Sequence, residues 1–348
     1  MRILVTGHLG YIGSVLVPRL LKLGHALVGC DTDLYAGSTF GAAPVAIDNI
    51  RRDIRDLIEA DFIGIDAVVH LAGLSNDPLG NLDPALTDDI NHRATIRMAE
   101  AARAAGVSRF LFSSSCSTYG AAGDSPIDEL APFNPQTPYG QSKVDAETNL
   151  AKLANNHFSP VYLRNATAYG DSPRLRFDLV VNNLVAWALT TGQVRLKSRG
   201  LAWRPLVHVE DICAAFEAAL RAPRASIHNQ AFNIGRSEDN IRIHALAQRI
   251  VDRIPGAKLT MADGAEIDAR TYRVDCSKAE QQLPGFTPCW DIDAGVEQLI
   301  TAIRERGLTL EAFEGPRYQR LAHLLERQSR GQLDTALRPV PEAVHAQH

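Results

Sequence analysis

Two residues near the middle of the chain have types and a spacing suited to proton transfer. Tyr139 and Lys143 stand in the run Tyr-Gly-Gln-Ser-Lys, so on a helix they lie one turn apart on the same face. A free tyrosine has a pKa of about 10, and a nearby ammonium group favours the phenolate. Tyr139 could therefore act as a base towards a hydroxyl group. The alternative is a packed tyrosine beside a solvated lysine.

A serine-rich run, Ser113-Ser114-Ser115-Cys116-Ser117, precedes this pair. It directly follows the apolar stretch 109–112, which predicts a buried strand. A serine hydroxyl at the end of that strand could share the proton relay with Tyr139 and the reacting oxygen. We therefore take Ser115, Tyr139 and Lys143 as the candidate catalytic residues.

A glycine-rich turn near the start of the chain predicts a phosphate-binding loop. Residues 2–6 read as a short buried strand, and Gly7, Gly10 and Gly13 follow it before an apolar helical period that runs to Leu23. In the order strand, glycine turn, helix, the backbone can approach a pyrophosphate, whose charge faces the helix N-terminus. The context favours dinucleotide binding over a merely tight turn.

The next predicted strand, 26–30, ends at Asp31. An acidic residue at this distance beyond a glycine loop can bind both hydroxyl groups of an adenosine ribose. It would repel a 2′-phosphate. The sequence therefore predicts NAD, rather than NADP, as the cofactor.

Strands and helices continue to alternate up to Thr167. Strands are expected at 45–47, 66–71, 109–112 and 161–163, and helices at 88–105 and 139–155. This alternation predicts an α/β fold with a Rossmann-type, doubly wound parallel sheet, whose ligands bind at the carboxyl ends of the strands. The candidate residues at Gly7, Asp31, Gly73, Ser115 and Arg164 all fall at such ends.

Beyond Thr167 the pattern loosens, and we expect a smaller C-terminal α/β substrate lobe. Helices are predicted at 175–191, 210–221, 241–254 and 291–306, with short strands at 205–209 and 231–235. The expected division gives residues 1–167 and 206–235 to the NAD-binding domain. Residues 168–205 and 236–327 form the substrate lobe, and the polar residues 328–348 form a loose tail.

Composition excludes several classes of protein. The formal net charge is -4, from 36 basic and 40 acidic residues that are spread along the chain, so neither nucleic acid nor a membrane surface is an expected partner. No window is apolar enough for a transmembrane span, and no cleavable leader is visible. The five cysteines are scattered without metal-ligand spacing, which predicts a cytoplasmic protein with no metal site.

Taken together, these motifs identify a family resemblance. The chain resembles an extended short-chain dehydrogenase/reductase of the NAD-dependent epimerase/dehydratase family, whose members mostly act on nucleotide-activated sugars. The resemblance covers roughly residues 1–305. It depends on the glycine loop, on Asp31, and on the segments 53–54, 70–73, 113–120, 139–143, 163–170, 204–211 and 275–278.

The resemblance implies roles for individual residues. Ser115 and Tyr139 match the catalytic pair, and Lys143 matches the ribose-binding lysine. The implied cofactor residues are Gly7, Gly10, Tyr11, Ile12, Gly13, Asp31, Asp53, Ile54, Leu71, Ala72, Gly73, Tyr139 and Lys143. The implied substrate residues are Asn76, Ser117, Asn165, Thr167, Arg204 and Arg270. Arg204 matches an arginine that holds the nucleotide diphosphate, and a surface ion pair is its alternative role. Helices near 90–105 and 139–155 are expected to form a homodimer interface.

The chain also departs from the family pattern. The sugar 4,6-dehydratases of this family carry Asp-Glu after the catalytic Ser/Thr, and here Cys116 and Ser117 stand there, so ordinary 4,6-dehydration is not expected. A thiol has a pKa of about 8.5, which a nearby cation can lower, so Cys116 is a candidate for proton transfer. Its alternative role is that of a small buried residue.

The resulting hypothesis is an NAD-dependent nucleotide-sugar epimerase that acts through a transient keto-sugar. Tyr139 is the base and Ser115 belongs to the proton relay. A keto-sugar reductase, a dehydrogenase or a dehydratase other than a 4,6-dehydratase would use the same residues. A catalytically silent NAD-binding protein is a third possibility, which an intact Ser115, Tyr139 and Lys143 disfavour.

Overall fold

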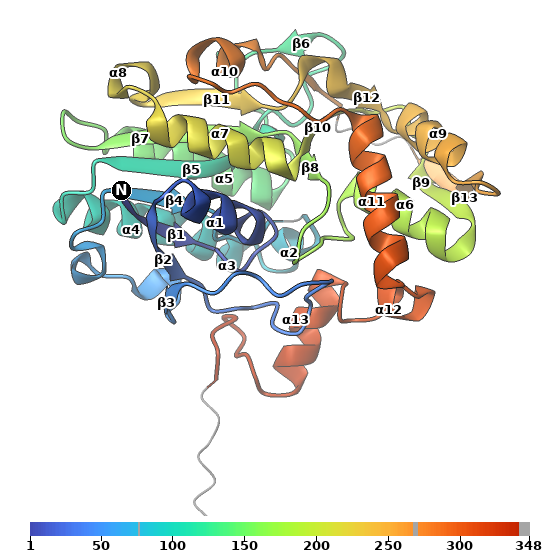
Figure 1. The fold of residues 1–348 in the computed structure, drawn as a ribbon, viewed down its shortest axis with the longest axis horizontal. Coiled ribbons are helices and arrows are strands. Elements are labelled where there is room, and N and C mark those ends of the chain that lie inside the picture. Colours follow the sequence, from blue (N-terminus) through green and yellow to red (C-terminus); the bar gives the residue numbers. More distant parts are fainter. Residues whose placement is uncertain (76, 267–270, 341–348) are drawn as a thin grey trace, which may run out of the picture.

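A seven-stranded parallel sheet lies at the centre of the molecule, in the order β11-β7-β5-β4-β1-β2-β3 (Figure 1). The computed structural model describes residues 1–75, 77–266 and 271–340. Each pair of neighbouring strands is parallel, which confirms the predicted doubly wound fold. The strands are β1 (Arg2–Thr6), β2 (Ala26–Cys30), β3 (Asp48–Ile50), β4 (Ala67–His70), β5 (Arg109–Ser115), β7 (Ser159–Asn165) and β11 (Gln230–Ile234).

Helices cover both faces of this sheet because successive side chains of a strand point in opposite directions. Ile3 and Val5 of β1 pack in one core with α1 (Gly13–Lys22) and α7 (Val209–Arg221). Leu4 packs in the opposite core with α4 (Ala94–Ala104) and α5 (Pro138–Ala151). Strands buried on both faces read as continuous apolar runs, which is why the sequence revealed them.

The helix expected over residues 88–105 is interrupted. It consists of α3 (Pro84–Asp88), a π-helical turn η3 (Asp89–Arg93) and α4. Turns of this kind occur mostly as single insertions within a helix, often near functional sites. Here the turn carries Asn91, which is buried and faces the loop after β4.

The second lobe has small sheets of its own. A three-stranded sheet contains β8 (Thr167–Tyr169), β10 (Trp203–His208) and β12 (Asn240–Arg242), and β9 (Gln193–Ser198) pairs with β13 (Lys258–Glu266). Its core is formed with α6 (Val180–Thr191), α9 (Ile243–Arg253) and α11 (Ile292–Arg306). The exact division into domains expected from the sequence stays a proposal, although β11 does return to the large sheet.

The shorter elements connect these layers. They are β6 (Pro126–Ile127), β14 (Arg273–Val274), α2 (Asp77–Leu82), α8 (Arg224–Ile227), α10 (Ser277–Gln282), η1 (Ile54–Asp56), η2 (Glu59–Phe62), η4 (Cys116–Thr118) and η5 (Ser237–Asp239). The strand expected at 45–47 lies slightly later, as β3. Among the described residues, no helix is long and apolar enough to cross a membrane.

The C-terminal segment is more ordered than expected. It contains α12 (Leu310–Glu314) and α13 (Arg320–Ser329), which Figure 1 shows at the bottom of the view. Residues 330–340 then contact the turn 54–56 through Ala336 and Arg338. Leu333 is 3% exposed and Leu337 is 7% exposed, both within the core that includes Ile54. The expectation of a loose tail was therefore wrong for residues 328–340. Two leucines spaced along this polar stretch, Leu333 and Leu337, are buried in that core and attach the segment to the first domain. Residues 341–348 lie outside the described part of the chain.

Candidate active site

One cavity of about 730 Å³ runs along the carboxyl ends of the central strands and into the second lobe. Small-molecule sites of enzymes commonly have volumes of this order. The cavity is lined by the loops after β1, β2, β4 and β5 and by residues of α5, α6 and β9. The arrangement follows the general rule that open parallel sheets bind ligands at their strand ends.

The glycine loop forms the floor of one end of the cavity. Gly7 has a φ of 71°, and a Cβ added there would stand 2.6 Å from the Ala72 nitrogen. A Cβ on Gly13 would stand 2.4 Å from the Gly7 oxygen. Neither position can therefore carry a side chain, and the backbone is left open to a pyrophosphate. Tyr11 and Ile12 line the same end, and the Tyr11 hydroxyl donates to the Gly170 carbonyl at 2.8 Å.

The carboxylate of Asp31 lies beside this loop. The amides of Leu9 and Asp33 donate to its two oxygens at 3.0 and 2.8 Å. Burial raises the pKa of Asp31, and these two hydrogen bonds act in the opposite direction. They fix the carboxylate at the edge of the cavity, where the sequence predicted a ribose ligand.

The neighbouring turn contributes Asp53 and Ile54 to the lining. The Asp53 carboxylate accepts from the Arg55 amide and from the Arg55 guanidinium, at 2.6 to 2.9 Å. This bonding orients the turn, and it occupies much of the acceptor capacity of Asp53. Ile54 is buried and presents an apolar surface to the cavity.

Asn91 holds the wall formed by Leu71, Ala72 and Gly73, a role that was not predicted from the sequence. Its side chain accepts from the Leu74 amide at 2.8 Å and donates to the Leu74 carbonyl at 2.9 Å. The same amide group donates to Ser142 Oγ at 3.2 Å. The residue therefore links the wall to the helix that carries Tyr139. An asparagine inside an apparently regular helix is the only sequence signal that could have drawn attention to it.

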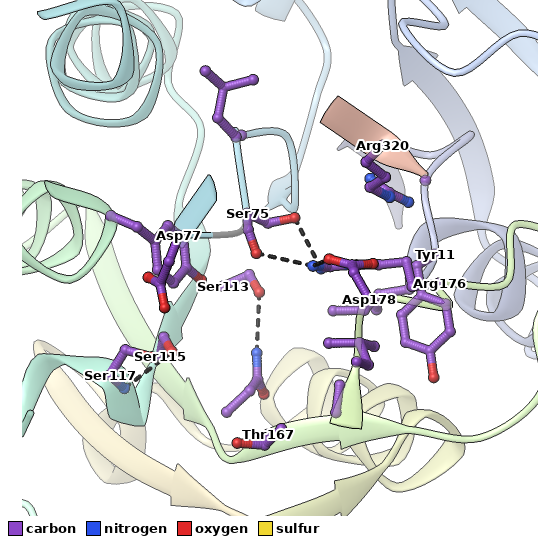
Figure 2. A pocket seen from close by; sticks show the side chains of 18 of the residues that line it. Tyr11, Ser75, Asp77, Ser113, Ser115, Ser117, Thr167, Arg176, Asp178 and Arg320 are labelled. Atoms are coloured by element: carbon purple, nitrogen blue, oxygen red, sulfur yellow. Dashed lines mark hydrogen bonds and ion pairs between the residues drawn. The ribbon is translucent and has the colours of Figure 1, made fainter. Parts of the chain in front are cut away.

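Ser115, Tyr139 and Lys143 all line the cavity. Ser115 ends β5, and its hydroxyl accepts from the Ser117 amide at 3.1 Å (Figure 2). Lys143 Nζ donates to the Ser113 carbonyl at 2.8 Å and lies 5.8 Å from the centre of the Tyr139 ring. Thr137 caps the helix by accepting from the Gly140 amide, which fixes where the first turn begins.

The electrostatics of this group depend mainly on burial. Burial raises the pKa of Tyr139, whereas the hydrogen bond with Ser115 and the charge of Arg176 lower it. Burial lowers the pKa of Lys143 to about 8, against the opposing charge of Glu147. A phenolate at Tyr139 therefore needs more positive charge than the protein provides, and a bound cationic cofactor ring would provide it.

Cys116 is not part of this group. Its side chain is fully buried in the core behind the loop, and Sγ donates to the Arg164 carbonyl at 3.1 Å. Burial raises the pKa of the thiol, so it stays protonated. The proposed proton transfer by Cys116 was therefore wrong, because alternation along the strand end turns residue 115 to the cavity and residue 116 to the core.

Four of the predicted substrate residues line the cavity: Ser117, Asn165, Thr167 and Arg204. Asn165 Nδ2 donates to Ser113 Oγ at 3.0 Å, and its buried Oδ1 accepts no hydrogen bond from the described residues. Such an atom is well placed to accept from a ligand hydroxyl. Arg204 extends from β10 and lies 5.9 Å from the Tyr272 ring. The two remaining predictions, Asn76 and Arg270, lie outside the described residues.

Arg176 is a cavity residue that the sequence did not single out. Its guanidinium donates to Ser75 Oγ at 2.9 Å and to the Ser75 carbonyl at 3.1 Å, and it pairs with Asp178 at 2.7 Å. Figure 2 shows it on the side of Tyr11, across the pocket from Ser115 and Ser117. Its positive charge acts to lower the pKa of Tyr139.

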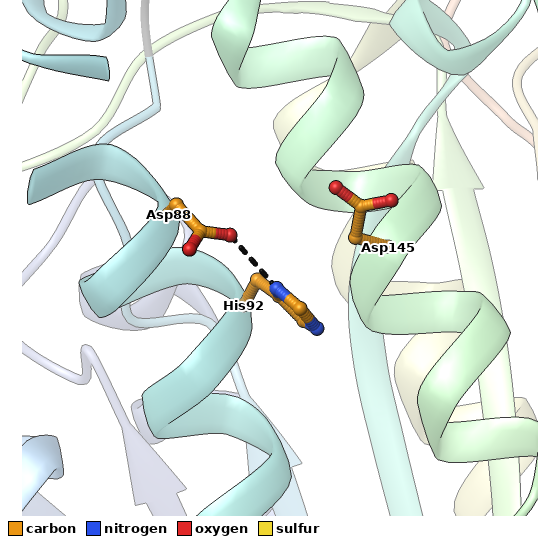
Figure 3. Close-up of side chains that lie close together, drawn as sticks. All are labelled: Asp88, His92 and Asp145. Atoms are coloured by element: carbon orange, nitrogen blue, oxygen red, sulfur yellow. Dashed lines mark hydrogen bonds and ion pairs between the residues drawn. The ribbon is translucent and has the colours of Figure 1, made fainter. Parts of the chain in front are cut away.

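Asp88, His92 and Asp145 form a separate cluster, with potential metal-ligand atoms within 4.8 Å of one another (Figure 3). His92 Nδ1 is 2.8 Å from Asp88, and its Nε2 is 2.9 Å from the Asn149 amide. Both ring nitrogens are thus engaged within the protein. The cluster connects the π-helical turn region to α5.

The cavity fits a dinucleotide. The two glycines without space for a Cβ, the fixed carboxylate of Asp31 and the apolar Ile54 are suited to the pyrophosphate, ribose and adenine of such a ligand. Fold and cavity together therefore define an NAD-binding, Rossmann-type enzyme with a tyrosine–lysine pair at its reactive end.

Comparison with known proteins identifies the family. Residues 3–235 match the model of the NAD dependent epimerase/dehydratase family, and the chain belongs to it. The UDP-glucose 4-epimerase of Mycolicibacterium smegmatis is 30% identical over 327 residues, which cover 88% of this chain and 99% of that one.

Two solved structures agree. MoeE5, in complex with UDP-glucuronic acid and NAD, has a TM-score of 0.75 at 28% identity, covering 88% of this chain and 99% of its own. The UDP-glucuronic acid 4-epimerase of Bacillus cereus, in complex with UDP-glucuronic acid and NAD, has a TM-score of 0.75 at 25% identity, with the same two coverages. The predicted family and NAD as cofactor are confirmed.

Proposed function

We propose that this protein is an NAD-dependent nucleotide-sugar epimerase that acts through a transient keto-sugar. The observation that carries the proposal is the meeting of Ser115, Tyr139 and Lys143 at one end of a cavity whose other end fits NAD. The relatives named UDP-glucose 4-epimerase and UDP-glucuronic acid 4-epimerase support the same reaction class.

Tyr139 removes the proton of a sugar hydroxyl, and Ser115 bridges the two oxygens. Bound NAD supplies the acceptor for the hydride that leaves the same carbon, and later the donor. Lys143 holds the cofactor ribose, and its ammonium stabilises the phenolate. When the hydride returns to the opposite face of the ketone carbon and Tyr139 gives its proton back to the ketone oxygen, the carbon has the inverted configuration. The net reaction consumes no cofactor.

The substrate side of the cavity carries charges suited to a nucleotide diphosphate. Arg204 lines this side together with the β9 residues Arg195 and Lys197. One guanidinium group can donate two parallel hydrogen bonds to two oxygens of a phosphate. We therefore assign Arg204 to the diphosphate. Asn165 is held beside Ser113 through its Nδ2, and we assign its open acceptor Oδ1 to the sugar.

A keto-sugar reductase or a dehydrogenase is the second candidate, because it would use the same three residues. The two reactions differ in their need for free cofactor. An epimerase converts its substrate without added NAD, whereas a reductase requires NADH in proportion to product.

The test begins with a thermal-shift panel of nucleotide sugars in the presence of NAD. Sugars that stabilise the protein are then incubated with it without added cofactor, and the products are separated by chromatography. Tyr139→Phe should reduce turnover about 10²- to 10⁴-fold while retaining NAD. Conversion that stops after one equivalent per protein would favour the reductase if it resumes only with NADH, and the dehydrogenase if it resumes only with added NAD. Full activity of the Phe variant would refute the role of Tyr139.

A further inference from the structure

We infer that the C-terminal segment, residues 316–340, is part of the NAD site: Arg320 binds the cofactor pyrophosphate, and Leu337 contacts the adenine. Gln319, Arg320 and Leu337 line the same cavity as the glycine loop and Asp31. The inference depends on NAD as the cofactor, and does not depend on which sugar is converted.

Hydrogen bonds from two arginines attach the segment to the loop after β2. Arg327 donates to the carbonyls of Asp33 and Leu34, both at 2.8 Å, and Arg317 donates to those of Gly37 and Thr39, both at 3.0 Å. Two arginines thus satisfy backbone carbonyls of an irregular loop that directly follows Asp31. These bonds hold α13 against the ribose end of the cavity.

A hydrogen bond and an ion pair attach the C-terminal segment to the turn after β3 as well. Arg55 donates to the Ala336 carbonyl at 2.8 Å, and Arg338 forms an ion pair with Asp56. Leu337 lies between these two contacts and shares a buried apolar cluster with Ile54. The side chains of Leu337 and Ile54 both line the cavity, and together they form an apolar surface for the flat adenine ring.

Arg320 begins α13, between Arg317 and Arg327 in the sequence. Its guanidinium is 4.0 Å from the centre of the Tyr35 ring, and Figure 2 shows it on the side of the pocket that carries Tyr11 and Arg176. Arg176 repels the Arg320 charge, whereas Tyr35 and Asp178 attract it. Asp178 is shared with Arg176, to which it is bonded at 2.7 and 3.1 Å. Two guanidinium groups beside a phosphate-binding loop are stabilised by an anion between them. The dinucleotide pyrophosphate is the anion that this end of the cavity fits.

The consequence is a retained cofactor. A segment that contacts both the pyrophosphate and the adenine must give up those contacts before NAD can leave, so dissociation is slow. Slow release suits a reaction in which the hydride returns to the same substrate.

The test compares NAD release from Arg320→Gln, Leu337→Ala and Arg330→Gln. Arg330 is the matched control, because it lies just after α13 and pairs with Glu326 on the exposed face. Each protein is purified with bound NAD, and exchange against excess isotope-labelled NAD is followed by mass spectrometry. We expect the Gln variant at 320 to release NAD about tenfold faster or more, the Ala variant several-fold faster, and the control at the unmodified rate.

Melting temperatures without cofactor show whether the variants fold. Release from both Arg320→Gln and Leu337→Ala at the control rate would overturn the inference and leave the proposed epimerase function intact. Failure of the unmodified protein to bind NAD would overturn the cofactor assignment itself.

Discussion

The guanidinium of Arg164 donates three hydrogen bonds to the carboxylate of Glu147, one at 2.7 Å and two at 3.1 Å. Ser114 also donates to this carboxylate, and both members of the pair are buried. Glu147 lies one turn beyond Lys143 on α5, and Arg164 lies on β7. The pair therefore fixes the helix that carries Tyr139 and Lys143 to the sheet.

Glu147→Gln should destabilise the protein by about 3 kcal/mol, because it leaves the Arg164 charge buried without its partner. Urea unfolding followed by circular dichroism measures the change. Lys152→Ala, at the exposed end of the same helix, is the control and should stay within about 0.5 kcal/mol of the unmodified protein. If Glu147→Gln lowered the free energy of unfolding by no more than Lys152→Ala does, the pair would contribute nothing to stability.

The lowered pKa of Lys143 predicts how stability depends on pH. Between about pH 8 and 10.5, the ordinary pKa of a lysine, the unfolded chain binds more protons at this residue than the folded one, so stability should rise with pH across that window. Below it the buried charge is a constant cost, of the order of 3 kcal/mol at ~1.4 kcal/mol per pKa unit. Lys143→Met without cofactor should therefore be more stable than the unmodified protein at pH 7, with the gap closing above about pH 10. A gap that is independent of pH would contradict this pKa.

Asp31 should set the choice between NAD and NADP. Its carboxylate would repel a 2′-phosphate, so isothermal titration should show much tighter binding of NAD. Asp31→Ala should reduce the ratio of the NAD affinity to the NADP affinity by roughly tenfold or more, because the repulsion between the carboxylate and the 2′-phosphate is removed. Equal affinity of the unmodified protein for the two cofactors would contradict the assignment.

Cys116→Ala should leave turnover nearly unchanged, because the thiol is buried and bonded to a backbone carbonyl. It should lower stability by about 1 kcal/mol through lost packing. Measured beside Tyr139→Phe, it separates packing from chemistry. If the Ala variant lost turnover as strongly as the Phe variant, Cys116 would have to reach the substrate by a rearrangement.

We propose a homodimer built on α4 and α5, as expected from the family resemblance. Sedimentation velocity at micromolar concentration should show a dimer, and Thr148→Arg on the exposed face of α5 should shift it towards the monomer. A monomer for the unmodified protein would refute the arrangement.

Much of the first domain could be predicted from the sequence because its signals are local. The buried strands are short apolar runs, and the glycine loop, Asp31 and the Tyr139–Lys143 pair each follow an element whose type is clear. Parallel strand ends then bring Gly7, Asp31 and Ser115 to one edge without further information. The NAD end of the cavity was therefore visible in the sequence, together with Ser115, Tyr139 and Lys143, whose roles stay predictions.

The parts that were missed depend on contacts between distant segments. Arg176 and Arg320 belong to no motif, and only the packing of the second lobe and of α13 brings them to the cavity. Asn91 was hidden because a π-helical turn has the same residue preferences as the helix around it. Cys116 was misassigned because a position next to a catalytic serine does not reveal the direction of its side chain.

The return of β11 to the large sheet affects the order in which the protein can fold. The catalytic strand β5 is flanked by β4 and β7, but β7 has its own outer neighbour only when residues 230–234 arrive, after the chain has passed through β8, α6, β9, β10 and α7. Pairings of such long sequence separation form slowly. A nascent chain that has not yet reached Ile234 therefore exposes the edge of β7, the strand that carries Arg164 and Asn165, and this is the stage at which the protein is most open to edge-to-edge association.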